Sequence, residues 1–377
     1  MPSPATASSR GRLSGRRAIL TGASSGVGLA AARLLAREGA DLALLARGKA
    51  GLAEAERVAR EEGVTAFAIP VDLGNRDAAI AATREAIDRL GGVDLVISNA
   101  AVTAFGHFAQ VPAEDFDRVV AVTFGGPVDI IRTALPELRR NAGTIVATGS
   151  LNARVPLPTF SSYAASKHAL RGFLNTLRVE ELEQGTGVQV AQVHPGPIDT
   201  PVFERSTSAT GKRPRRPPDA YRAEVVAQAL VEAAVDPVAE RLIGGETRAV
   251  DVAFGPARPV VERLLMMIDR WYRSGTEEAP ERGSLWAPYD HPAISGGMPS
   301  RESLTAWTRF GRRLLPSPAT PLKLASNLAA AGLQAAHIAG DLFGGPIPER
   351  HLPVPGAEAT SDTRAPERGQ KATKTAV

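Results

Sequence analysis

Three residues near the middle of the chain could together move a proton to or from a substrate oxygen. Ser150 follows the apolar run GTIVAT, Tyr163 comes thirteen positions later, and Lys167 four positions after that. On a helix, Tyr163 and Lys167 would lie on one face, one turn apart. An ammonium beside a phenol lowers the pKa of the phenol from about 10, which would make the tyrosine a proton donor and acceptor near neutral pH. Tyr-x-x-x-Lys also occurs on solvated helices, so the interpretation needs a second signal.

That signal is the glycine-rich turn TGASSGVG, which lies between an apolar run and a helical pattern. A dinucleotide site needs Gly22 for the turn, Gly26 for close approach of the backbone to a pyrophosphate, and Gly28 for packing of the helix on the strand. The start of the helix then offers free N–H groups to the phosphates. The residues predicted to bind the cofactor here are Gly22, Ser24, Ser25, Gly26, Val27 and Gly28.

The end of the second apolar run bears on which nicotinamide cofactor is bound. An acidic residue there would bind the adenosine ribose and repel a 2′-phosphate. This chain instead has Arg47 and Lys49 and no acid. Arg47 can fork onto a phosphate, and Ser24 can add a hydroxyl. The pattern favours NADP(H) and leaves NAD(H) open; the alternative is that Arg47 is a solvated loop residue.

Short apolar runs alternate with helical patterns over the first two thirds of the chain, which is typical of βαβ units. The fold class predicted is α/β: a Rossmann-like, doubly wound parallel sheet of about seven strands with helices on both faces. A mainly helical C-terminal extension follows. The expected strands are 17–21, 41–46, 64–70, 93–98, 143–150, 187–196 and 241–245, and the expected helices are 27–38, 51–62, 75–90, 113–140 and 161–184.

These motifs, in this order and spacing, resemble the short-chain dehydrogenase/reductase family in its single-domain branch. The likeness includes HPGPIDT, at 194–200, and covers about residues 14–245. The resemblance implies that Tyr163 is the general acid/base, that Lys167 lowers its pKa and holds the nicotinamide ribose, and that Ser150 binds the substrate oxygen. It further implies cofactor contacts from Asp72, Leu73, Asn99, Ala100, Pro195, Gly196, Ile198 and Thr200.

The chain departs from the family pattern at two positions. The family has glycine where Ala101 follows Asn99 and Ala100, so an added methyl group must fit beside the cofactor. The family also places an asparagine, which holds a proton-relay water, where this chain has Thr123. Thr123 can still hydrogen-bond a carbonyl or a water, so it is counted among the catalytic residues, with an altered relay geometry.

Composition excludes some sites and partners. The chain has no cysteine, which rules out disulfides and thiolate chemistry, and its six histidines show no metal-ligand spacing, so no metal site is expected. The net charge is only +4, and the basic run at 212–216 lacks the aromatic residues of a nucleic-acid surface. No nucleic-acid partner is therefore expected. We expect a homodimer or homotetramer, and a cytoplasmic location because the N-terminus has no secretory pattern.

The domain organisation predicted is a disordered leader (1–13), a catalytic domain (14–250), a helical extension (251–345) and a disordered tail (346–377). Within the extension, a second apolar helix over 322–342 carries too many polar residues to span a membrane. It could dock on the core or on a partner subunit, or, less favourably, lie on a membrane surface.

The motifs together predict an NADP(H)-dependent oxidoreductase that interconverts an alcohol and its ketone or aldehyde. The small-molecule substrate is expected to be lipophilic, because the residues around the cleft are mostly apolar. The alternative is a nucleotide-sensing or scaffold protein with weak or no turnover, which the substitutions at Ala101 and Thr123 leave open. The apolar residues expected at the substrate are Leu151, Val155, Leu157, Phe160, Val202 and Phe203.

Overall fold

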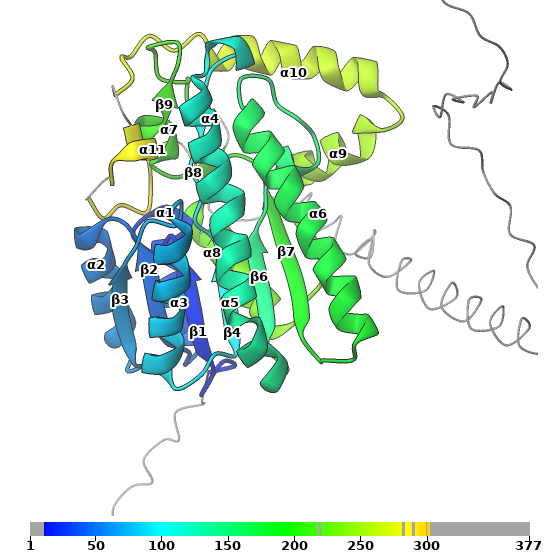
Figure 1. Ribbon diagram of the computed structural model, residues 1–377. Helices are drawn as coiled ribbons and strands as arrows, with labels where there is room; N and C mark the ends of the chain where they lie inside the picture. Colours follow the sequence, from blue (N-terminus) through cyan, green and yellow to red (C-terminus); the bar gives the residue numbers. More distant parts are fainter. Residues whose placement is uncertain (1–10, 218–219, 281–282, 289–290, 299, 302–377) are drawn as a thin grey trace, which may run out of the picture. The chain divides into compact units, whose positions relative to one another are not determined.

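Seven parallel strands form one sheet, and they are the apolar runs that the sequence predicts (Figure 1). Their order is β11-β7-β6-β4-β1-β2-β3, and every neighbouring pair is parallel. The central strands are buried along their whole length, as a sheet covered on both faces requires. The strands are β1 Arg17–Thr21, β2 Asp41–Ala46, β3 Ala66–Pro70, β4 Leu95–Ser98, β6 Thr144–Thr148, β7 Gln189–Pro195 and β11 Glu240–Ile243.

The structure is a computed structural model that describes residues 11–217, 220–280, 283–288, 291–298 and 300–301. Within the expected leader, Leu13 is described, and its side chain is buried in the core. The other predictions for the ends of the chain lie outside the described residues: the leader over 1–10, the apolar helix at 322–342 and the tail at 346–377.

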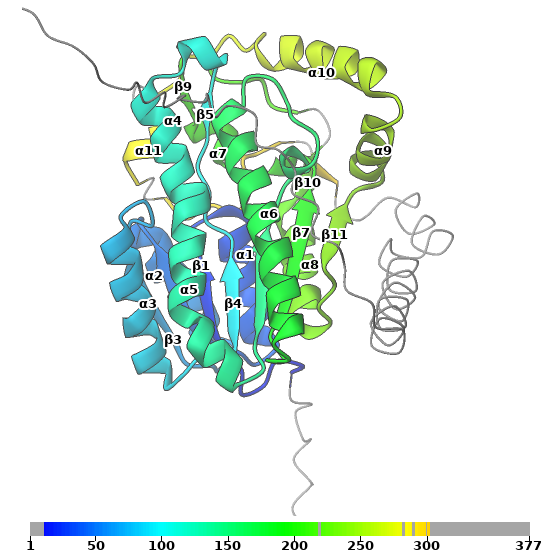
Figure 2. The same cartoon turned by 45° about the vertical axis from the view of Figure 1, so that its right-hand side comes forward.

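Helices cover both faces of the sheet, which confirms the predicted doubly wound architecture (Figures 1 and 2). α1, α2 and α8 pack on one face, and α3, α5 and α6 on the other. The sequence does not predict α8; the expected ends of the other strands and helices agree with the structure to within two residues, apart from the long helix discussed below. The helices are α1 Gly26–Arg37, α2 Lys49–Arg60, α3 Arg76–Leu90, α5 Gly126–Arg140, α6 Ser161–Glu183 and α8 Ala223–Val235.

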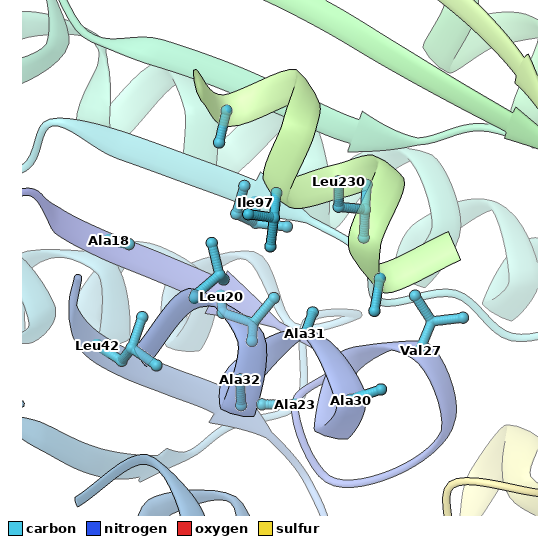
Figure 3. Packing of buried hydrophobic residues seen from close by; sticks show 14 of the residues in the cluster. Ala18, Leu20, Ala23, Val27, Ala30, Ala31, Ala32, Leu42, Ile97 and Leu230 are labelled. Atoms are coloured by element: carbon cyan, nitrogen blue, oxygen red, sulfur yellow. The ribbon is translucent and has the colours of Figure 1, made fainter. Parts of the chain in front are cut away.

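Small side chains allow α1 to lie close to the sheet. Figure 3 shows Ala31 of α1 between Leu20 of β1 and Leu230 of α8, with Ile97 of β4 beside them. All four side chains are fully buried. This packing fixes the start of α1, and with it the glycine-rich turn, above the carboxyl end of β1.

The order of the strands places a ligand crevice beside β1. The chain passes from β1 to β2 and β3 on one side, and β4 then pairs with β1 on the other side. Connections that leave in opposite directions open a crevice at the carboxyl ends of the strands, where ligands of such sheets bind. The predicted site residues that follow β1, β2, β4, β6 and β7 all belong to this edge.

The helix expected over 113–140 is interrupted. α4 (Ala113–Val120) is followed by a π-helical segment, η2 (Ala121–Gly125), before α5 begins. Such wide turns are frequent at functional sites. Within the described residues, this run is also the one helix long and apolar enough to cross a membrane, and half of that stretch is buried inside the structure.

Residues beyond the last strand of the sheet pack on the part of the chain that carries it. The boundary expected at residue 250 falls inside α9 (Gly245–Phe254), and α10 (Arg258–Tyr272) follows it. Val261 and Leu265 of α10 pack against Val155. The remaining short elements are β5 Ala104–Phe105, η1 Phe108–Gln110, η3 Leu151–Ala153, β8 Ile198–Asp199, α7 Val202–Arg205, β9 Thr207–Ser208, β10 Ala220–Arg222, α11 Gly283–Trp286 and β12 Ser300–Arg301.

Candidate functional site

One cavity of about 570 Å³ lies at the carboxyl ends of the strands and brings together nearly all the predicted site residues. Gly28 and Thr123 are the two that do not line it. The predicted residues that do are Gly22, Ser24, Ser25, Gly26, Val27, Arg47, Asp72, Leu73, Asn99, Ala100, Ser150, Tyr163, Lys167, Pro195, Gly196, Ile198 and Thr200.

The glycine-rich turn has the geometry that its sequence requires. Gly22 has a φ of +68°, which only glycine adopts readily, and its N–H donates to the carbonyl of Leu45 at 2.7 Å. A Cβ at Gly28 would lie 1.9 Å from the carbonyl oxygen of Gly22. Gly28 therefore packs the helix against the turn, behind the cavity wall, and does not face a ligand.

Hydrogen bonds tie the end of β4 to its neighbours. The Thr21 hydroxyl accepts from the N–H groups of Asn99 and Ala100, at 2.9 and 3.0 Å, and the Thr148 hydroxyl donates to Asn99 Oδ1 at 3.0 Å. Ala101, where the family has glycine, is not among the described residues with a positive φ. Its methyl group is therefore accommodated without backbone strain.

Ser150, Tyr163 and Lys167 meet as predicted. Ser150 follows β6, whereas Tyr163 and Lys167 lie one turn apart in α6. The Ser150 side chain acts on the Tyr163 hydroxyl in the direction that lowers its pKa, and Ser150 Oγ accepts from the N–H of Asn152 at 3.0 Å. Lys167 Nζ lies 5.6 Å from the centroid of the Tyr163 ring and donates to the carbonyl of Thr148 at 2.7 Å. The three groups thus converge on one wall of the cavity.

The expected lowering of the tyrosine pKa is wrong for the protein as described. Burial raises the pKa of Tyr163 to about 12, against which the Ser150 hydrogen bond acts in the lowering direction. Burial also lowers the pKa of Lys167, to about 8. Removing either group from water penalises its charged form, and the Lys167 ammonium is directed at a carbonyl oxygen. At neutral pH the phenol therefore keeps its proton.

His194, one of the six histidines that show no metal-ligand spacing, holds the backbone of Ser150. Its side chain is fully buried, and Nδ1 lies 3.3 Å from the nitrogen and 3.2 Å from the oxygen of Ser150. Burial lowers the pKa of His194 to about 4. A Cβ on residue 149 would meet the imidazole at 2.3 Å, which explains Gly149. The imidazole is therefore neutral at physiological pH and fixes the peptide that carries the serine.

Thr123 does not reach the cavity. It lies in the π-helical segment with no exposed surface, and its hydroxyl accepts from the N–H of Val102 and donates to the carbonyl of Val102, both at 3.1 Å. Since both hydrogen bonds are made to the backbone of one residue, Thr123 supports Val102, which itself lines the cavity. The catalytic role expected for Thr123 is thus not supported by its position.

Arg47 lines the cavity, but its guanidinium is engaged by the C-terminal part of the chain. It donates to the carbonyls of Ser284 and Leu285, in the latter case at 3.0 Å. Burial lowers the pKa of Arg47. A second cation, Arg118 of α4, also donates to the carbonyl of Leu285, at 3.2 Å, and pairs with Asp72. Sequence reasoning missed Arg118, because no local pattern distinguishes it from other charged residues of a helix.

The far end of the cavity is apolar. All six residues expected there line it, and α10 contributes a wall of four more that sequence reasoning did not place. Tyr272 of α10 stacks on Phe203, with ring centroids 6.0 Å apart. The α10 residues that line the cavity are Leu264, Leu265, Ile268 and Tyr272.

Three of the four cations in the basic run are paired. Lys212, Arg213 and Arg216 of the basic run form ion pairs with Glu278, Glu277 and Glu204. Among the described residues, no group of three or more histidine or acidic side chains could hold a metal ion.

Comparisons with known proteins agree with this geometry. The family model described as short chain dehydrogenase matches residues 16–211. The uncharacterized oxidoreductase YxnA of Bacillus subtilis is 32% identical over 84% of this chain and 88% of its own length. An alcohol dehydrogenase of Thermococcus sibiricus, solved with 5-hydroxy-NADP, has a TM-score of 0.54 and 26% identity over 60% of this chain and 95% of its own.

A metagenomic short-chain oxidoreductase solved with NADP is similar to the same extent. Its TM-score is 0.53, with 27% identity over 62% of this chain and 98% of that protein. The match to the family model spans more than half of the chain, and the match to YxnA extends into its C-terminal part. The chain therefore belongs to the short-chain dehydrogenase family of oxidoreductases.

Proposed function

We propose that the protein is an NADP(H)-dependent oxidoreductase that interconverts an alcohol and its ketone or aldehyde. The observation that supports this most directly is the single cavity. It joins a glycine-rich turn and a cationic side chain at one end to Ser150 and Tyr163 at the other. The solved alcohol dehydrogenase that resembles the chain carries an NADP derivative, which supports the same cofactor here.

The residues present fit a phosphorylated dinucleotide. Gly26 begins α1, so its N–H has no acceptor within the helix. A Cβ at Gly22 would lie 2.9 Å from Ala100, which shows how closely the cradle is built. Arg47 suits a 2′-phosphate, whereas no acid follows β2 to favour NAD(H), the weaker alternative. When bound, the nicotinamide supplies or accepts the hydride.

The side chains of the protein supply the proton. Ser150 and Tyr163 hold the substrate oxygen, where negative charge develops during reduction of a carbonyl. With its pKa raised to about 12, Tyr163 holds a proton at neutral pH and donates it to that oxygen. Oxidation of the alcohol requires the phenolate instead. The buried Lys167, close to the ring, provides the positive charge that favours the phenolate.

The shape of the cavity supports a lipophilic substrate. Aromatic and aliphatic side chains from α7, α10 and the loop before α6 surround its far end. α10 lies beyond the family match, so its share of this wall comes from the C-terminal part of the chain. Apolar area of this kind stabilises a bound hydrocarbon by roughly 25 cal/mol per Å² removed from water.

An NADPH-oxidation assay with ketones and aldehydes of increasing apolar size tests the proposal. We expect turnover that improves with apolar size, and a loss of at least about a hundredfold in the variant Tyr163→Phe, with NADPH binding preserved. Residual activity close to wild type would show that the proton comes from another group. NADPH binding without turnover of any compound would favour the alternative, a nucleotide-sensing protein.

We also propose a cytoplasmic homodimer or homotetramer. Val179 and Leu182 of α6 are 64% and 57% exposed, so α6 offers apolar surface to a second copy. Light scattering of the purified chain measures the mass directly. A monomer at micromolar concentration would refute the proposed assembly.

A further inference from the structure

The C-terminal strap, defined here as residues 283–288 and 291–298, contacts the cofactor end of the cavity. Figure 1 shows α11 of the strap above the carboxyl ends of β1 and β2, and Figure 2 shows it beside α4. Ser284 and Pro288 line the cavity. These residues lie far outside the family match, and neither the motifs nor the matched region predicts them at this position.

Carbonyl oxygens of the strap accept hydrogen bonds from two donors that the proposed cofactor needs, the Gly26 N–H and the Arg47 guanidinium. The carbonyl of Ala293 accepts the N–H of Gly26 at 2.8 Å. This N–H, at the first position of α1, is the type of donor that binds phosphate. The carbonyls of Ser284 and Leu285 accept from the guanidinium of Arg47. Peptide oxygens of the strap thus occupy both places where phosphate oxygens are expected.

Other contacts hold the strap beside the cavity without using these donors. Leu285 is fully buried among apolar side chains of α4 and of the chain after β4. Trp286 Nε1 donates to Asp115 at 2.6 Å. At the other end, Asp199 accepts from the Ser295 hydroxyl at 2.6 Å and from the N–H of Met298 at 3.1 Å. The strap therefore has two anchors, with the three carbonyls between or next to them.

A phosphate is the stronger partner for these donors. A charged acceptor makes a hydrogen bond roughly twice as strong as a neutral carbonyl does, and a guanidinium matches phosphate in a two-bond geometry. The carbonyls can therefore be displaced. While they are bound, the apparent dissociation constant of the cofactor equals the intrinsic one divided by the fraction of molecules in which the donors are free.

We propose that the strap is an internal competitor of the cofactor, whose peptide carbonyls hold the Gly26 amide and the Arg47 guanidinium until the phosphates of NADP(H) displace them. This inference rests on the proposed cofactor. Because a 2′-phosphate would compete at Arg47 and the pyrophosphate at Gly26, NADPH must displace both contacts, whereas NADH displaces mainly the second. Weakening an anchor should therefore favour NADPH more than NADH.

The variants Leu285→Ala and Trp286→Phe loosen the first anchor and leave both donors unchanged. The change Val260→Ala is the control, since Val260 is an exposed apolar residue of α10 outside the strap. Fluorescence titration of the full chain measures the dissociation constants of NADPH and NADH. We expect the anchor variants to bind NADPH about three- to tenfold tighter, with a smaller gain for NADH and no change in the control. Circular dichroism verifies that each variant is folded.

Hydrogen–deuterium exchange of the wild-type chain is an independent test, because the inference predicts whether NADPH speeds or slows exchange of the strap amides. If the strap competes, added NADPH releases it, and its amides exchange faster, because the coupling between the two is reciprocal. Slower exchange, or weaker NADPH binding by the anchor variants, would show that the strap is a cover that stabilises bound cofactor, and would overturn the inference. Unchanged affinity in both variants overturns it as well. Absence of NADPH binding in every protein would instead refute the proposed function, and the inference with it.

Discussion

Replacing His194 should remove much of the acid sensitivity of the fold. The imidazole has no exposed surface, and its Nε2 is a buried atom without a described hydrogen-bond partner. Burial is the main cause of the lowered pKa; the Glu240 carboxylate favours the charged form, whereas Arg154 and Arg171 oppose it. A proton on this ring must therefore enter a buried site next to Ser150.

The size of the effect follows from linkage between protonation and folding. The pKa of His194 is about 4 in the folded chain, against a usual value of 6.5. A depressed folded pKa means that the contribution to stability is complete above pH 6.5 and is lost as the pH falls toward 4. Between about pH 7.5 and about pH 5, the free energy of unfolding should fall by about 2 kcal/mol from this group alone. Ordinary carboxyl groups stay charged over that interval.

Urea unfolding at these two pH values measures the loss directly. In His194→Asn the difference between the two free energies should shrink to less than about 0.5 kcal/mol, whatever the absolute stability of the variant. The matched control is His168→Asn, because His168 is an exposed histidine of α6. An equal pH dependence in wild type and His194→Asn would refute the assignment of a neutral, buried imidazole.

Three other predictions concern the site. Arg47→Asp should weaken NADPH binding by about tenfold or more and reverse the preference toward NADH, as the ratio of the two dissociation constants will show; an unchanged ratio contradicts the assignment. Thr123→Val should lower the free energy of unfolding by about 1–3 kcal/mol, since the Val102 peptide loses two buried hydrogen bonds, and thermal unfolding tests this. Because Tyr163 keeps its proton well above neutral pH, carbonyl reduction should stay constant between about pH 6 and 8, whereas alcohol oxidation should rise with pH; rate profiles in both directions would expose the opposite behaviour.

The predictable part of the site depends on local spacing. A strand followed by the glycine-rich turn fixes where Gly22 and Gly28 must lie, because other residues would clash with the turn itself. A four-residue interval on one helix is enough to place Tyr163 beside Lys167. Such patterns need no knowledge of distant residues, so the sequence alone predicts them and the sheet that carries them.

The sign of the tyrosine pKa shift was not predictable in this way. Proximity of Lys167 favours a lower pKa, whereas burial favours a higher one, and the balance depends on how much water surrounds both groups. That amount is set by the packing of the whole cavity, including Phe160 and α10. A pattern of two residues cannot contain this information.

Arg47 shows the same limit at longer range. Its position after β2 places it on the wall of the cavity, yet its acceptors are carbonyls 237 and 238 residues away. Peptide carbonyls are offered by every residue, so no side-chain pattern in the strap could indicate them. Only the anchor residues, such as the buried Leu285 and the exposed Trp286, carry a signal, and that signal is an apolar pair in a proline- and glycine-rich stretch. The hydrogen bonds of Arg47 thus depend on the C-terminal part of the chain, in which the sequence motifs predict no contact with the site.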